Sequence, residues 1–121
     1  MSLFGLFGKK QELPSLDTEK VDGMAQNGSK LRLLLTDAIP WKDGSLPEKD
    51  HLIQLQKKIN NYIAFYESGQ YKSIYPDYEP DGAVIDIHFK YAVTDNCKKF
   101  LNAVRSQISG SGIEINIKQV I

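Results

Sequence analysis

The sequence predicts an α+β fold, a two-layer sandwich in which two helices cover one face of a four-stranded mixed sheet. Three observations predict it: a hairpin signal, two segments of helical periodicity, and an alternating strand after each of those segments. The element order is therefore β-β-α-β-α-β. Right-handed crossovers place both helices on the same face of the sheet, and the order of the strands stays open.

The hairpin is predicted from Asn27-Gly28, a dipeptide typical of two-residue turns in which both positions take positive φ. Segments 19–26 and 30–39 flank it. Alternate residues of a strand share a face. The second strand is therefore expected to turn Leu31, Leu33 and Leu35 toward the core.

The first helix is predicted to run from about Leu46 to Ser68. Ser45 and Glu48 have the spacing of a capping box, and Gly69 is a helix stop. Apolar residues recur at helical spacing and predict the buried stripe: Leu52, Leu55, Ile59, Tyr62, Ile63 and Tyr66. The tyrosine-rich segment 70–82 is expected to be an ordered loop with a short helical turn.

The second half of the domain is predicted as strand, helix and strand. The first strand covers Ala83 to Val93, with Ala83, Ile85, Ile87, Phe89 and Tyr91 on the core face. Thr94 is expected to cap the second helix, which buries Cys97, Phe100, Leu101, Val104 and Ile108. After "GSG" the last strand turns Ile113, Ile115 and Ile117 toward the core.

Composition excludes several classes of protein. The 121 residues suit one domain, and fifteen basic residues balance fifteen acidic ones, which argues against a general nucleic-acid binder. The single cysteine, Cys97, allows neither an internal disulfide nor a cysteine-based zinc site. No glycine-rich phosphate loop is present, so we expect no cofactor. No apolar run is long enough to span a membrane, and we expect a cytoplasmic protein.

Residues 1–17 are predicted to be a flexible or loosely packed tail, followed by a single domain over residues 18–121. An alternative is a weak membrane-surface tether, because the start of the chain is apolar and then basic. The residues that would carry the tether are Leu3, Phe4, Leu6, Phe7, Lys9 and Lys10.

Residues spread over positions 19–110 resemble a family of small bacterial domains of unknown function. The pattern is an Asp and a nearby Trp, then HL-x-x-LQ-x-K-x-N-x-Y-x-x-F-x-ESG, then Tyr-Pro and F-x-Y. It is carried by Asp37, Trp41, His51, Leu52, Leu55, Gln56, Lys58, Asn60, Tyr62, Phe65, Glu67, Ser68, Gly69, Tyr75, Pro76, Phe89 and Tyr91. The resemblance implies domain boundaries and no activity.

His51 and Asp37 are the most enzyme-like pair. An Asp at the end of a strand and a His in the first turn of the next helix could meet and act as base and orienting group. The alternative is structural, with Asp37 binding backbone donors in the connection. A metal site at Asp86 and His88, joined by Glu114, is not expected, because two neighbouring ligands do not make a closed site.

The tyrosines and the single tryptophan predict a contact surface. Tyrosine combines apolar area with a polar tip, which suits interfaces. We expect a non-catalytic protein-binding or accessory module that binds a protein partner or itself through Trp41, Tyr71, Tyr75 and Tyr78, with the open sheet face as a second surface. The alternatives are a small enzyme that uses His51 and Asp37, and the membrane-surface protein described above.

Overall fold

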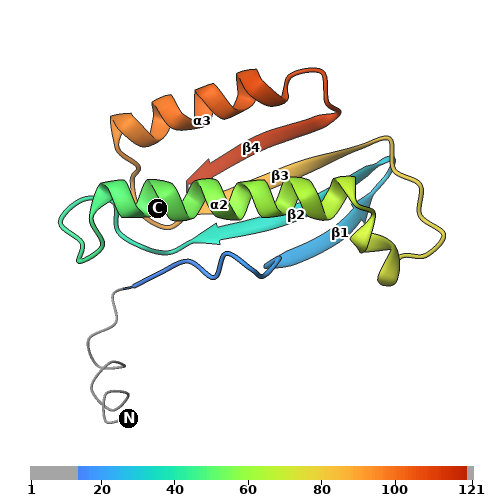
Figure 1. The fold of residues 1–121 in the computed structure, drawn as a ribbon, viewed down its shortest axis with the longest axis horizontal. Coiled ribbons are helices and arrows are strands. Elements are labelled where there is room, and N and C mark those ends of the chain that lie inside the picture. Colours follow the sequence, from blue (N-terminus) through green and yellow to red (C-terminus); the bar gives the residue numbers. More distant parts are fainter. Residues whose placement is uncertain (1–13, 120–121) are drawn as a thin grey trace, which may run out of the picture.

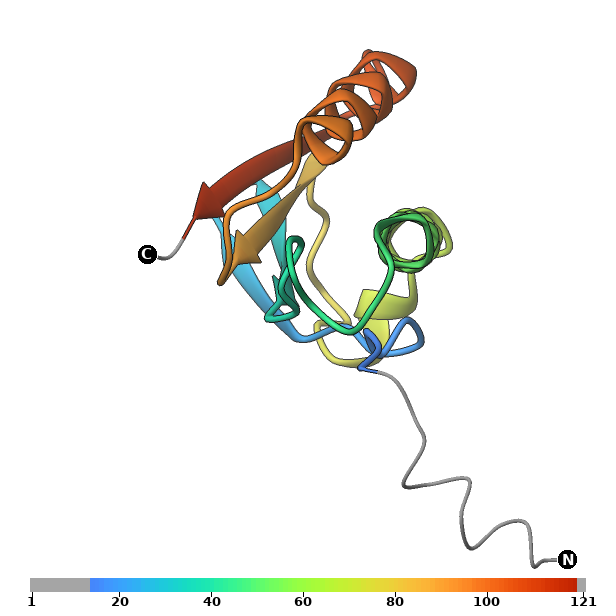
Figure 2. The same cartoon turned by 90° about the vertical axis from the view of Figure 1, so that its left-hand side faces the viewer.

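The computed structural model describes residues 14–119 and confirms the predicted architecture. A four-stranded sheet has the order β1 (Gly23–Asn27), β2 (Lys30–Asp37), β3 (Gly82–Phe89) and β4 (Ile113–Gln119). β1 is antiparallel to β2, whereas β2, β3 and β4 run parallel. The helices α2 (Glu48–Glu67) and α3 (Asp95–Ile108) lie on the same face of the sheet (Figures 1 and 2).

The core fills the space between the sheet and the two helices. Most of the predicted core-facing residues of the strands are buried, and Leu31, Leu33, Leu35, Ile85 and Ile87 have no exposed surface. Ile117 is only partly buried. Burying a side chain of this size contributes about 1.5–3 kcal/mol. The opposite face of the sheet is covered by no helix of the described chain (Figure 2).

The predicted hairpin is confirmed, but its turn lies one residue further along. Asn27 pairs with Lys30, so the two loop residues are Gly28 and Ser29. Of these two loop residues, only Gly28 has a positive φ, of 61°. A glycine first in the turn followed by an ordinary residue fits a type II′ turn, whereas two positive φ values would make a type I′ turn.

The predicted capping box at Ser45 is wrong. Pro47 is the N-cap residue of α2, its ψ of 145° is extended, and no side chain caps the helix. The reason lies in the preceding connection, which buries Trp41 and Leu46 in the core while Ser45 stays exposed. The predicted stop is confirmed, because Ser68 is the C-cap residue and Gly69 has a φ of 78°.

The strand predicted to reach Val93 ends at Phe89, and Tyr91 is 39% exposed instead of core-facing. Phe89 pairs with Asp37, the last residue of β2, and the Lys90 amide donates to the Asp37 carbonyl oxygen. Because β2 ends there, the chain beyond residue 90 has no strand to extend along on that side.

The remaining elements follow the sequence closely. The loop after α2 contains a short helical turn, η2 (Gln70–Ser73). Thr94 caps α3, since its Oγ1 accepts a hydrogen bond from the Cys97 amide at 3.1 Å. In the part of the chain that the structure describes, no helix is long and apolar enough to cross a membrane.

Candidate functional site

The enzyme-like pair meets at the corner between β2 and α2. Asp37 is the last residue of β2 and His51 lies in the first turn of α2. The imidazole Nε2 is 2.8 Å from Asp37 Oδ2, and the other carboxylate oxygen accepts from the Ile39 amide at 3.0 Å. Both side chains have zero exposed surface. The pair therefore has the geometry of a base and its orienting group, but no access to solvent.

Trp41 closes this corner. Its ring stacks on His51 with centroids 3.5 Å apart and planes 11° from parallel, and it meets the Phe89 ring edge-on at 6.2 Å. Trp41 is only 4% exposed. Two ring nitrogens, Trp41 Nε1 and His51 Nδ1, are buried without a hydrogen-bond partner among the described residues. Trp41 therefore covers the His51 ring and offers little surface to a partner.

Cys97 is buried at the start of α3. Burial, together with the smaller effect of the nearby negative charges of Asp37 and Glu48, raises the pKa of its thiol to about 12. The thiolate is the reactive form of cysteine. Cys97 is therefore a protonated core residue near neutral pH and not a nucleophile for the Asp37–His51 pair.

The tyrosines of the loop after α2 lie against the hairpin. Tyr71 is 7% exposed and stacks on Tyr66. The Tyr75 hydroxyl donates to the Met24 carbonyl oxygen at 3.3 Å, and the Tyr78 hydroxyl donates to the Gly28 carbonyl oxygen at 2.8 Å. The polar tips predicted to meet a partner thus bind the chain's own β1 and its turn. Tyr75 and Tyr78 keep part of their rings at the surface.

Residues 70–81 are here called the tyrosine loop. A further surface feature of this loop is Ile74, which is 61% exposed. It lines an open pocket of about 350 Å³ together with Gln26, Tyr75, Pro76, Asp77 and Tyr78. Two other acids of the loop are paired, Glu79 with Lys72 and Asp81 with Lys30. Asp77 forms no ion pair with another residue of the described chain. We call the six lining residues the tyrosine pocket.

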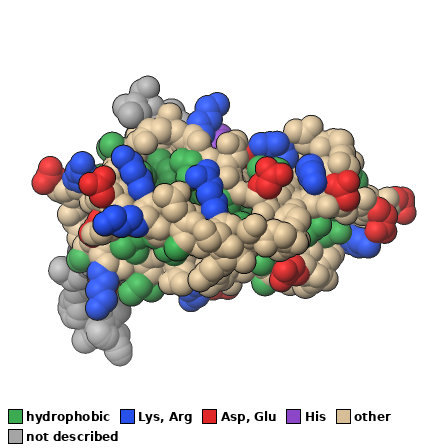
Figure 3. Space-filling model, turned by 90° about the horizontal axis from the view of Figure 1, so that it is seen from above, with side chains coloured by type: hydrophobic (Ala, Val, Ile, Leu, Met, Phe, Trp, Pro, Cys, Tyr) green, Lys and Arg blue, Asp and Glu red, His purple; other side chains and the backbone are tan. Residues whose placement is uncertain are grey.

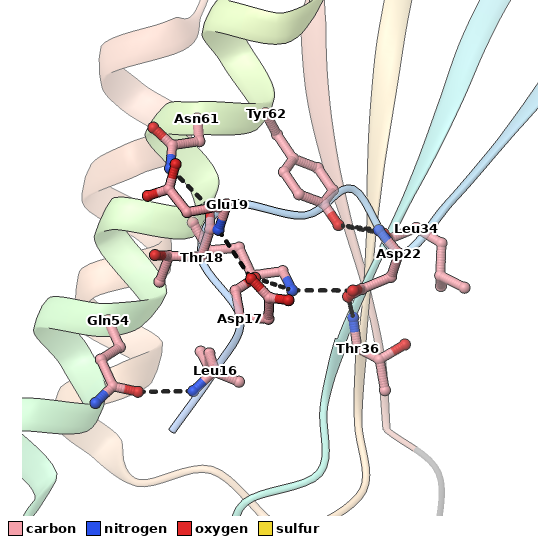
Figure 4. Close-up of polar contacts among 11 residues, drawn as sticks. Leu16, Asp17, Thr18, Glu19, Asp22, Leu34, Thr36, Gln54, Asn61 and Tyr62 are labelled. Atoms are coloured by element: carbon pink, nitrogen blue, oxygen red, sulfur yellow. Dashed lines mark hydrogen bonds and ion pairs between the residues drawn. The ribbon is translucent and has the colours of Figure 1, made fainter. Parts of the chain in front are cut away.

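A second polar cluster was not predicted from the sequence. Residues 14–22, here called the N-terminal strap, run along α2 (Figure 4). The strap's main chain is held by α2 side chains. Gln54 accepts from the Leu16 amide at 2.8 Å, and Asn61 donates to the Thr18 carbonyl oxygen at 2.7 Å. Leu16 itself belongs to the core.

Lys58 and Tyr62 tie the far end of the strap to the sheet. Lys58 is only 2% exposed, and its amine donates to the Asp17 carbonyl oxygen at 2.8 Å and to the Asp22 carboxylate at 3.0 Å. The Tyr62 hydroxyl accepts from the Asp22 amide and donates to the Leu34 carbonyl oxygen. Burial raises the pKa of Tyr62 well above its usual value.

The signal for the strap was present in the spacing of α2. Gln54, Lys58, Asn61 and Tyr62 fall at helical intervals and so share one face. A polar row of this kind ordinarily indicates a solvated helix face. The spacing alone therefore does not distinguish a solvated row from one that binds the main chain of a neighbouring segment.

The open face of the sheet carries a polar network at its centre. Arg32 donates to both oxygens of Asp86, at 2.7 and 2.8 Å, and Asn116 donates to the same carboxylate at 2.8 Å. Burial favours a higher pKa for Asp86, but the bonds from Arg32 and Asn116 outweigh it and hold the pKa below its usual value. In residues 14–119 no three side chains of the metal-binding types gather in one place.

A family model described as a family of unknown function (DUF6572) matches residues 14–120. Neither the curated proteins nor the solved structures include a match. The matched range begins with the strap and ends with β4, so it covers every element described above.

Proposed function

We propose that this chain, which belongs to that family of unknown function, is a non-catalytic protein-binding module whose contact surface is the tyrosine pocket. The observation that carries the proposal is Ile74, a large apolar side chain that is 61% exposed beside a partly open pocket. Exposed apolar residues next to tyrosines are typical of contact surfaces.

The anchoring of the tyrosines supports the same surface. The hydroxyls of Tyr75 and Tyr78 are fixed on β1 and its turn, and the two rings meet edge-on with centroids 6.0 Å apart. Rings already held in place lose little conformational entropy when a partner binds. The carboxylate of Asp77 forms no ion pair within residues 14–119, and it favours a partner segment that offers an apolar side chain beside a lysine or arginine.

The enzyme alternative has less support. The Asp37–His51 pair lies under Trp41 with no exposed surface, and the Cys97 thiol is protonated. A general base must come within hydrogen-bond reach of the proton it removes. The residues proposed as a membrane tether, in the first ten positions, lie outside the described residues.

The test is capture of partners from a lysate of the source cells by the full-length chain and by two variants. Ile74→Glu places a charge in the tyrosine pocket. Ile53→Glu is the matched control, because Ile53 is 52% exposed on α2. We expect Ile74→Glu to lose a captured protein that wild type and Ile53→Glu retain, with all three chains folded. Identical capture by the two variants would contradict the proposal.

A further inference from the structure

β4 is one edge of the sheet, and half of its backbone groups point away from β3. In a parallel ladder, successive residues direct their N–H and C=O groups alternately to the two sides. The Gly112 carbonyl oxygen accepts from the Ala83 amide on β3, so even-numbered residues of β4 face β3. The outward groups therefore belong to Ile113, Ile115 and Ile117. The described residues supply no fifth strand to pair with them.

The other edge of the sheet is bonded by tyrosines of the loop after α2. The Met24 carbonyl oxygen, which points away from β2, is bonded by the Tyr75 hydroxyl, and Tyr78 bonds the Gly28 carbonyl oxygen in the turn. On β4 two outward groups are bonded by side chains. The Ile113 amide donates to Ser111 Oγ at 3.2 Å, and Arg105 Nη2 donates to the Ile115 carbonyl oxygen at 3.1 Å. An exposed edge strand is a template for pairing with another chain.

A pocket of about 270 Å³ lies beside this edge, between β4 and α3. Its apolar wall is formed by Val93, Leu101 and Ile117, and Lys98 and Arg105 also line it. The surface on the α3 side of the molecule shows apolar side chains among lysines and arginines (Figure 3). A strand that pairs with β4 would place its apolar side chains next to this pocket.

We propose that β4 pairs antiparallel with β4 of a second copy of the chain, about a twofold axis at Asn116, and joins two four-stranded sheets into one. The argument for a second copy is charge complementarity. On the open face β4 carries Glu114 and Lys118, two residues either side of Asn116, and all three side chains are exposed. The twofold sets each Glu114 directly opposite Lys118 of the second copy.

Backbone geometry agrees with this register. Pairing about Asn116 sets Ile115 opposite Ile117 of the second copy, and both residues have outward N–H and C=O groups, as a hydrogen-bonded antiparallel pair requires. Arg105 need not leave, because the Ile115 carbonyl oxygen has a second lone pair. All seven residues of β4, Ile113–Gln119, stand opposite a residue of the second copy in this arrangement. At its ends the Ile113 amide exchanges Ser111 Oγ for the Gln119 carbonyl oxygen of the second copy.

Other registers are less favourable. A twofold at Glu114 sets two carboxylates directly opposite each other, and a twofold at Lys118 sets two ammonium groups opposite each other, which is destabilising. A twofold at residue 115 or 117 sets a charged side chain opposite Asn116 and leaves residues of β4 unpaired. The pairing about Asn116 is thus the one that combines full overlap with two opposite-charge pairs.

The test is the association of full-length chains, measured by sedimentation equilibrium from about 10 µM to about 1 mM. Glu114→Lys and Lys118→Glu each convert both cross-strand pairs to like charges and are expected to weaken association about tenfold or more. The double variant exchanges the charges and should restore wild-type association. An equimolar mixture of the two single variants should form a heterodimer more tightly than either variant associates alone.

The control is Glu79→Lys, the same change of charge on the tyrosine loop at the opposite edge; it should associate as wild type does. Ile74→Glu should also leave association unchanged. A result against β4 pairing is therefore distinguishable from a result against partner binding at the tyrosine pocket. A wild-type chain that is monomeric up to about 1 mM would overturn the proposal. Association that responds equally to Glu79→Lys, or that the double variant does not restore, would overturn it too.

Discussion

Two buried polar clusters flank α2, and they are built in opposite ways. At the corner, the side chains of Asp37, His51 and Trp41 contact one another. Along the strap, side chains of α2 bind main-chain groups of residues 16–22. Each contact at the corner therefore depends on the identity of both residues. Most contacts of the strap depend only on the identity of the α2 residue, because a main-chain group is available at any position. In both places, residue types that suggest chemistry make buried contacts within the domain.

The largest expected effect is at the corner. Asp37→Ala removes the acceptor for His51 Nε2 and for the Ile39 amide, both of which are buried. Breaking a buried pair by removing one partner costs about 3–5 kcal/mol. We expect a loss of that size in the free energy of unfolding, measured with urea. The control Asp77→Ala, at an exposed site, should change it by less than about 0.5 kcal/mol. A loss below about 1 kcal/mol at Asp37 would mean that the corner is not held by this pair.

At the strap, Lys58→Met is expected to cost about 2 kcal/mol, because the Asp17 carbonyl oxygen and the Asp22 carboxylate lose their donor. The loss should be local, with faster hydrogen exchange at the amides of Leu16 and Asp22. Lys49→Met is the matched control, since Lys49 is an exposed lysine of the same helix, whereas the Lys58 side chain is 2% exposed. Equal exchange in the two variants would show that the strap is held by other contacts.

The smallest effect near neutral pH is a dependence of the unfolding free energy on pH, which separates the two clusters only as pH rises. Cys97 lies near the corner and Tyr62 holds the strap, and folding raises the pKa of each. A group with a raised pKa stabilises the fold fully below its unfolded pKa, and this stabilisation is lost as pH rises. The loss should begin near pH 8.5 for Cys97 and near pH 10 for Tyr62, at up to about 1.4 kcal/mol per pH unit for each group.

Single variants assign these two slopes. Cys97→Ala should flatten the dependence of the unfolding free energy on pH between about 8.5 and 10, and Tyr62→Phe should flatten it only above about pH 10. The free energy is read from urea curves at each pH. A Cys97→Ala chain that keeps the wild-type slope would contradict the burial of the thiol.

The corner could be predicted from the sequence because its signals are local. Asp37 ends an alternating strand and His51 begins a periodic helix, so the element boundaries alone bring them to the same end of the sheet. Their burial could not be predicted, since it depends on Trp41 folding back from an irregular connection. The capping box failed for the same reason: Ser45 has the right spacing, but the path of residues 38–47 is set by the core.

The strap could not be predicted because main-chain contacts leave no pattern in the segment that is bound. Residues 14–22 have neither periodicity nor alternation, and their partners lie some forty positions away on α2. Tyr75 and Tyr78 present the same difficulty, since they bind backbone carbonyls of the hairpin. A tyrosine that bonds the backbone at a sheet edge has the same sequence signature as one that contacts a partner.

The strand order has a consequence for how the chain folds. β1 and β2 are joined by two residues, so their hairpin can close within about 1–10 µs. β3 lies at the centre of the sheet, and each of its neighbours is separated from it by a helix. Closing connections as long as these helical crossovers slows folding. During synthesis on the ribosome, β3 can pair with β2 once the first crossover is complete, and its other side stays unpaired until the second crossover brings β4. A chain that stops short of β4 would expose the most apolar strand of the protein along a whole side.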